Sequence, residues 1–136
     1  MADRAEVAKA YLGRVRAIKD DLEELEQDYE GQKALRYEPV KGKRGFEEKL
    51  VRERSLLEKI DATEERLDRT RAEISSNIGR IKDPMVRNVL HKTFMEGKNA
   101  TEVGMELSIT PRQVRRCKER GYQMIPLPKK WERLVK

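Results

Sequence analysis

Arginine, glutamine and glutamate side chains cluster in the segment from Pro111 to Gln123, near the C-terminus of this 136-residue chain. At about 100° per residue, a helix over this segment turns them outward when its apolar residues face inward. Arginine forms two hydrogen bonds with guanine, glutamine suits adenine, and glutamate accepts a hydrogen bond from cytosine. The residues expected to contact base edges are Arg112, Gln113, Arg115, Arg116 and Glu119. The pattern predicts binding to double-stranded DNA.

A second set of residues flanks this face and suits the DNA backbone. The expected backbone contacts are Lys98, Thr101, Thr110, Lys118 and Arg120. Lysine and arginine neutralise phosphates, and the free N–H groups at a helix start attract an anion. A basic helix face is also often only solvated, and this plainer interpretation stays open.

The positive charge is concentrated in the same part of the chain. Residues 82–136 contain 13 Lys and Arg against 6 Asp and Glu, a net charge of +7, whereas residues 1–81 contain 18 against 19, a net charge of −1. The whole excess of +6 therefore belongs to the C-terminal part. A local excess of this size favours a polyanionic partner, and nucleic acid is the first candidate.

Two helix starts in close succession position the basic face. Asn99 and Glu102 are expected to form one capping box, and Thr110 and Gln113 a second at the start of the next helix. Residues 107–109 leave room only for a tight turn, and this spacing predicts a helix-turn-helix. The core expected for it consists of Val103, Leu107, Ile109, Val114 and Cys117.

Another helix is expected to precede these two. Asp83 is its expected cap, Pro84 occupies the first helical position, and Gly97 ends it. Gly104 is expected to let the two later helices cross closely. Residues 83–125 are therefore predicted to form a small helix-turn-helix domain.

The first 82 residues show the spacing of two long helices. Apolar residues step alternately by three and four positions, which predicts a helix over about residues 3–30. A second series with the same spacing predicts a helix over about residues 45–82. Residues 31–45 contain glycines and a proline and are expected to form a connector without regular structure. Together these elements predict an antiparallel coiled-coil hairpin over residues 1–82.

One register of the hairpin brings the two apolar series together. It places Val15 opposite Ile60 and Tyr11 opposite Glu64, whose carboxylate can accept a hydrogen bond from the tyrosine. Three isoleucines then extend past the first helix and are expected to pack on the helix-turn-helix or across a dimer axis: Ile74, Ile78 and Ile81. Separate intermolecular coils, which would make the chain a homodimer, stay an open alternative.

The expected fold class is all-α, with a long antiparallel helical hairpin followed by a small helix-turn-helix domain. Residues 126–136 form a C-terminal tail, in which the segment around Trp131 can dock as a short helix.

The chain lacks the residues that enzymes and metal sites require. Its single cysteine, Cys117, and single histidine, His91, form neither a disulfide nor a metal cluster nor a base and nucleophile pair. No Gly-rich phosphate loop is present. We therefore expect no enzymatic activity, metal site or cofactor. Without a membrane-length apolar run or a signal peptide, the chain is expected to be cytoplasmic and nucleoid-associated, with no membrane partner.

The residues Glu102-Val103-Gly104, Leu107-Ser108-Ile109-Thr110 and Gln113-Val114-Arg115-Arg116 resemble the helix-turn-helix of the fourth conserved region of bacterial sigma factors. With the charged hairpin, nearly the whole chain is similar to small phage late-gene transcriptional regulators of the ArpU and RinA type. This resemblance implies a sequence-specific DNA-binding activator of phage or prophage genes that acts with host RNA polymerase.

The chain departs from the family pattern at three positions. Gly104 and Gly121 stand where the family usually has alanine, and Ser108 where it usually has glycine. A glycine in place of alanine weakens a helix by about 1 kcal/mol, so the end of the recognition helix is expected to be less secure.

Two other function classes stay open. One is the DNA-recognition small subunit of a phage terminase, which also joins a helix-turn-helix to helical assembly elements. The other is a coiled-coil adaptor whose basic domain binds an acidic protein. A ring of many protomers would favour the terminase subunit, and weak competition by duplex DNA would favour the adaptor.

Overall fold

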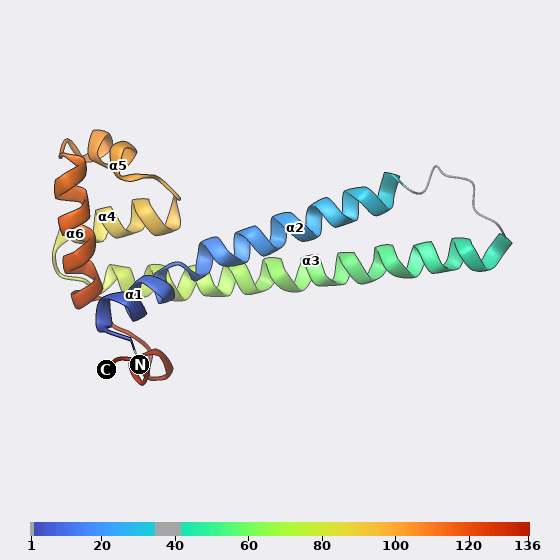
Figure 1. The fold of residues 1–136 in the computed structure, drawn as a ribbon, viewed down its shortest axis with the longest axis horizontal. Coiled ribbons are helices and arrows are strands. Elements are labelled where there is room, and N and C mark those ends of the chain that lie inside the picture. The colour runs from blue at the N-terminus through green and yellow to red at the C-terminus, as the bar shows by residue number, and fades with distance from the viewer. Residues whose placement is uncertain (1, 35–41) are drawn as a thin grey trace. The chain divides into compact units, whose positions relative to one another are not determined.

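The computed structural model describes residues 2–34 and 42–136, except the side chain of Lys43. The regular elements in these ranges are helices, with one isolated bridge between Ala2 and Val135 (Figure 1). The predicted all-α class is therefore confirmed. The chain forms two compact units, one of residues 1–16 with 69–136 and the other of residues 17–68.

The single N-terminal helix predicted over residues 3–30 is wrong, because the helix is interrupted at Gly13. Helix α1 spans Arg4–Leu12, with Asp3 as its cap, and helix α2 spans Arg14–Ala34. A glycine loses more conformational entropy in a helix than other residues, which makes it a natural place for an interruption. Helix α2 also continues past Gly31, the expected start of the connector.

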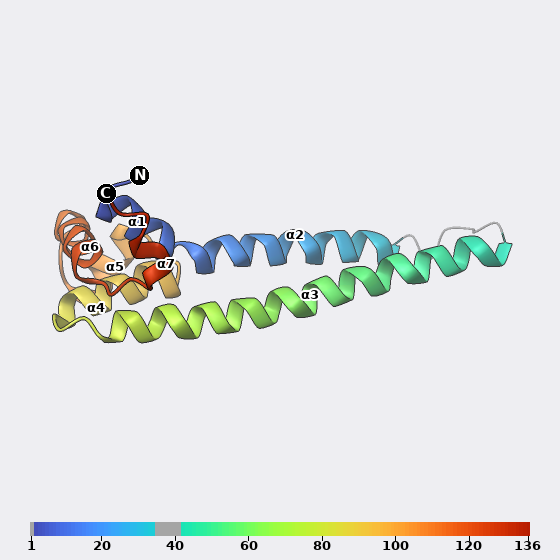
Figure 2. The same ribbon diagram turned by 90° about the horizontal axis from the view of Figure 1, so that it is seen from below.

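In the unit of residues 17–68, α2 lies beside helix α3 and runs in the opposite direction (Figure 1 and Figure 2). Helix α3 spans Gly42–Gly79, so the connector predicted over 31–45 is helical at both of its ends. The rest of that connector, residues 35–41, lies outside the described residues.

The predicted register between the two helices is wrong by twelve positions along α3. Arg66 Nη2 lies 3.4 Å from Asp21 Oδ2, whereas the predicted register placed Arg54 there. The apolar series repeats along each helix, so several registers bring apolar side chains together. Apolar spacing alone does not encode which of these registers forms.

The inward face of α3 also differs from the predicted series, which included Leu57, Glu64 and Arg71. Leu57 is 40% exposed, and Glu64 and Arg71 are exposed. The half-buried or buried residues are instead Leu56, Thr63 and Thr70. Each lies one position earlier, and a threonine can enter the helix interface because its hydroxyl bonds the preceding turn, as Thr63 Oγ1 does to the carbonyl of Lys59 at 2.7 Å.

Helix α6, Pro111–Met124, lies at the centre of the unit of residues 1–16 with 69–136. It packs against α1, against α4, Pro84–Leu90, and against α5, Ala100–Leu107. The predicted start of α4 is present, because the Asp83 carboxylate accepts hydrogen bonds from the N–H groups of Met85 and Val86 at 3.0 and 3.3 Å. A π-helical turn, η2, His91–Met95, follows α4 directly.

The three isoleucines in the last turns of α3 and just after it contribute to the core of this same unit. The side chains of Ile74, Ile78 and Ile81 are at most 2% exposed. Arg71 donates to the carbonyl of Met95 at 3.3 Å, and Arg87 donates to the carbonyl of Ile81 at 2.7 Å. These bonds join α3 to η2, and the segment after α3 to α4.

Tyr11 bonds a different carboxylate from the predicted Glu64. Its hydroxyl donates to Glu73 Oε2 at 3.1 Å and accepts from Asn77 Nδ2 at 2.7 Å. Tyr11 is fully buried, and this burial raises the pKa of its hydroxyl to about 12. The N-terminal helix is thus bonded to α3 within the unit that contains α6.

The two chain termini lie together in this unit (Figure 1). The Ala2 N–H donates to the Leu134 carbonyl at 3.2 Å, and the Lys136 N–H donates to the Ala2 carbonyl at 2.9 Å. Just before Leu134 in the chain, helix α7 spans Lys129–Glu132, and its Trp131 ring lies 5.5 Å from the Tyr11 ring. The compact units therefore do not follow the predicted boundaries of 1–82, 83–125 and 126–136.

Candidate nucleic-acid interface

Two capping boxes set the starts of α5 and α6. Asn99 Oδ1 accepts from the Glu102 N–H at 2.9 Å, and Glu102 Oε1 accepts from the Asn99 N–H at 3.3 Å. Thr110 Oγ1 accepts from the Gln113 N–H at 3.1 Å, and Gln113 Oε1 accepts from the Thr110 N–H at 2.8 Å. Both predicted boxes are confirmed, and each satisfies two of the N–H groups that a helix start leaves without partners.

The turn between α5 and α6 depends on Ser108 and Gly104. Ser108 is left-handed, with φ 58° and ψ 43°, a conformation that glycine adopts more easily. A Cβ atom on Gly104 would lie 2.6 Å from the Ile109 carbonyl oxygen. Gly104 thus makes room for the turn itself, whereas the expectation was a close crossing of helices.

The C-terminal end of α6 is held by contacts with two other helices. A Cβ atom on Gly121 would lie 2.7 Å from Leu90 Cδ1, so this glycine lets α4 approach closely. Arg4 of α1 donates to the carbonyls of Gln123 at 3.3 Å and Ile125 at 2.7 Å. The helix continues past Gly121 to Met124, and these tertiary contacts act against the low helix propensity of glycine.

The buried side of α6 agrees in part with the predicted core. Val103, Val114 and Cys117 are buried, whereas Leu107 and Ile109 are only half-buried. The buried residues that sequence reasoning did not assign to this side of the helix are Gly121 and Tyr122.

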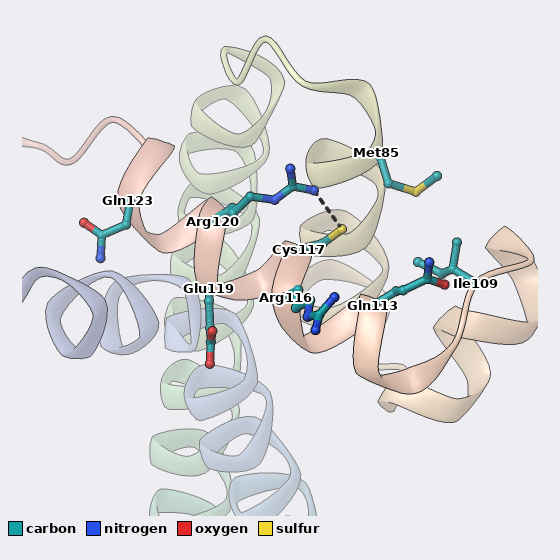
Figure 3. A pocket seen from close by; sticks show the side chains of 8 residues that line it. All are labelled: Met85, Ile109, Gln113, Arg116, Cys117, Glu119, Arg120 and Gln123. Carbon is teal, nitrogen blue, oxygen red and sulfur yellow. Dashed lines mark hydrogen bonds between the residues drawn. The ribbon is translucent and has the colours of Figure 1, made fainter.

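The outward guanidinium groups of α6 have no acidic partner among the described residues. Arg112, Arg115 and Arg116 are exposed, and none forms an ion pair or hydrogen bond with another described side chain. Glu119 is also exposed, and Figure 3 shows it on the same helix as Arg116. Four of the five residues predicted to contact bases are therefore available on the surface.

Gln113 is the exception among the predicted base contacts. Its Oε1 atom already accepts from the Thr110 N–H, so it is engaged within the capping box. Recognition of adenine by glutamine needs both the oxygen and the NH₂ group. Because the oxygen is engaged, only the NH₂ group is free to bond a base, and the main role of Gln113 in this structure is to cap α6.

Lys98, a predicted backbone contact, is already neutralised. Its Nζ atom lies 2.6 Å from Glu106 Oε1 and 3.0 Å from Glu96 Oε1. The hydrogen bond with Glu106, followed by the one with Glu96, raises the pKa of Lys98, and the bonds with Lys98 lower the pKa of both carboxyl groups. A phosphate would have to compete with both carboxylates for this ammonium group.

Lys118 has the opposite surroundings. Its side chain is half-buried, and this burial lowers the pKa of its ammonium group, as do the nearby charges of Lys9 and Arg115. Lys9 comes from α1, so sequence reasoning had no signal that would place it beside α6.

The remaining predicted backbone contacts are exposed. Thr101 lies in the first turn of α5, and Thr110 caps α6. Arg120 Nη2 donates to Cys117 Sγ at 3.5 Å (Figure 3). Its Nη1 atom lies 4.0 Å from Asp83 Oδ2.

An open groove of about 810 Å³ runs beside α6 (Figure 3). Apolar atoms of Met85 and Ile109 line one part of it, while Gln113, Arg116 and Arg120 contribute polar groups. The groove widens the surface that α6 presents without enclosing a cavity.

Among residues 2–34 and 42–136, no group of three or more His, Cys, Asp or Glu is placed to hold a metal ion. No helix in these ranges is long and apolar enough to cross a membrane. Comparisons of the chain with protein-family models, curated proteins and solved structures find no match.

Proposed function

We propose that this protein is a sequence-specific, double-stranded-DNA-binding regulator of transcription. In this proposal α5, the turn at Ser108 and α6 form a helix-turn-helix, and α6 is the recognition helix. The observation that carries the proposal is the exposed row of Arg112, Arg115 and Arg116, which has no ion-pair partner among the described residues.

The contrast with other cations of the same unit supports this choice of face. Arg4 and Arg87 donate to backbone carbonyls, and Lys98 is paired with two carboxylates. Arg112, Arg115 and Arg116 have no such partners among the described residues, and all three lie on α6. When cations neutralise phosphates, counterions leave the DNA, and this release favours binding.

The helix itself is well suited to enter a major groove. One side of α6 is closed by α1, α4 and α5, so its exposed side is presented on a fixed support. The major groove of B-DNA is about 12 Å wide and admits an α-helix. Arg112 and Arg116 are four residues apart and therefore project from the same side.

The pair of helices α2 and α3 has a separate role in the proposed regulator. We assign it the role of a coiled-coil hairpin that joins two copies of the chain or contacts host RNA polymerase. The resemblance to phage late-gene regulators of the ArpU and RinA type motivates this assignment, and it makes the protein an activator of phage or prophage genes.

The direct test is selection of random-sequence duplexes by the purified full-length chain at about 50 mM salt, where phosphate contacts are strong. We expect the retained fragments to share a short motif. Retention without sequence preference would reject the sequence-specific function, and failure to retain any duplex would reject DNA binding altogether.

A coiled-coil adaptor is the second candidate, and one observation favours it. Apolar side chains on α3 are exposed: Phe46, Leu50, Val51 and Leu57. An adaptor would bind a partner protein in preference to duplex DNA. An excess of duplex that fails to displace a captured acidic protein would support the adaptor over the regulator.

A further inference from the structure

Three cations from two helices gather on one flank of α6. Arg115 and Lys118 lie one helical turn apart on α6, and α1 packs against this helix and contributes Lys9. Arg4, on the same short helix as Lys9, bonds the last carbonyls of α6. The position of Lys9 beside α6 therefore follows from the packing of α1.

The charges of these three cations are not balanced by ion pairs among the described residues. None of Lys9, Arg115 and Lys118 forms an ion pair with a described carboxylate. The Lys118 ammonium group is also partly withdrawn from water, and desolvation makes an uncompensated charge more costly. An anion bound here would compensate all three charges.

We propose that Lys9, Arg115 and Lys118 bind phosphate groups of the DNA backbone, so that the N-terminal helix α1 is part of the DNA interface. This inference rests on the proposed function, because it presumes that the exposed side of α6 lies in the major groove. Arg115 follows Arg112 by three residues and leaves α6 toward one side of that exposed face. The walls of the groove carry the phosphates, and cations on the flank of a recognition helix face them.

The test compares single-charge variants of the full-length chain in binding to the selected duplex across a salt series. Lys9→Gln removes an exposed positive charge from α1 and keeps a residue of similar helix propensity. We expect the slope of log affinity against log salt to fall by about 0.9, because one phosphate contact is lost. Between about 50 and 200 mM salt, the variant then loses affinity about 3.5-fold less than the wild type does.

Two controls separate this site from a general charge effect. Lys59→Gln removes one charge from an exposed lysine of α3, in the other compact unit. Lys9→Arg keeps the charge and is expected to keep the wild-type slope. The motif selected by Lys9→Gln should be unchanged, because phosphate contacts carry no sequence information.

The possible results point to distinct conclusions. A slope for Lys9→Gln equal to that of the wild type, or an equal change in Lys59→Gln, overturns the phosphate site and leaves the proposed function intact. A wild-type chain that binds no duplex overturns both. A thermal unfolding midpoint of Lys9→Gln close to that of the wild type establishes that the variant is folded.

Discussion

Lys98 and Lys118 are two lysines of the same compact unit with opposite electrostatic surroundings. Lys98 lies between the carboxylates of Glu96 and Glu106, which raise the pKa of its ammonium group. Lys118 is half-buried beside Lys9 and Arg115, and its pKa is lowered. Both contribute equally to the net charge of +6, yet only one of them is available to a new anion. Net charge alone therefore does not locate a binding surface.

The largest expected effect concerns the turn that connects α5 and α6. We predict that Gly104→Ala destabilises the protein by about 1–3 kcal/mol, because the new methyl group would press against the backbone oxygen of Ile109 at 2.6 Å. Urea unfolding measures this change. In the matched variant Gly31→Ala, nothing lies within 4 Å of the added atom, and stability should rise by up to about 1 kcal/mol. A stabilising Gly104→Ala change would contradict the close approach.

The next effect concerns the centre of the exposed side of α6. Arg116→Ala should reduce discrimination between the selected duplex and a single-base variant by about 1–3 kcal/mol, because the proposed bidentate contact with one base would be lost. Competition binding with the two duplexes measures the difference. Equal loss of affinity for all sequences would instead make Arg116 a phosphate contact.

Substituting each of the two lysines tests whether their surroundings lead to different contributions to DNA binding. Lys118→Gln should lower the salt slope of DNA binding by about 0.9, whereas Lys98→Gln should leave it unchanged. The reason is that the Lys98 charge is already balanced by Glu106 and Glu96. Anisotropy titrations of both variants across a salt series give the two slopes. Equal slopes would show that the ion pairs of Lys98 open when DNA binds.

The smallest effect is the acid sensitivity of the Lys98 surroundings. The pKa of Glu96 and of Glu106 is lowered from 4.5, so both carboxylates add stability above that value and lose it as the pH falls through their lower folded-state pKa. The unfolding midpoint of Glu106→Gln should therefore fall less steeply below about pH 4.5 than that of the wild type. Parallel curves for the two proteins would contradict this linkage.

Contacts between residues close in the chain were predictable from the sequence, and contacts between distant residues were not. Both capping boxes were predictable because each joins residues three positions apart, as Thr110 and Gln113 show. The neutralisation of Lys98 was not predictable in the same way, although Glu106 is only eight residues away. A bond of this kind needs the turn between η2 and α5 to bring the two side chains together.

Long-range register was the least predictable feature. The alternation of apolar residues indicated two long helices, and α2 and α3 exist, but Asp21 with Arg66 lies twelve positions from the predicted pairing. Gly13 interrupts the first helix, which frees α1 to pack on α6. The energy of such packing is shared among many weak contacts, and no single residue in the sequence predicts it.

The sequence by itself determined the all-helical class, the starts of α4, α5 and α6, and the outward position of the arginines on α6. These follow from hydrogen bonds and spacing within a few residues, where the chain connectivity supplies the geometry. Tertiary structure alone decided that Lys98 is paired, that Leu90 packs at Gly121, and that Lys9 lies beside Lys118. Those contacts join residues whose proximity depends on how whole helices pack, and helix packing depends on side-chain shape and burial across the unit.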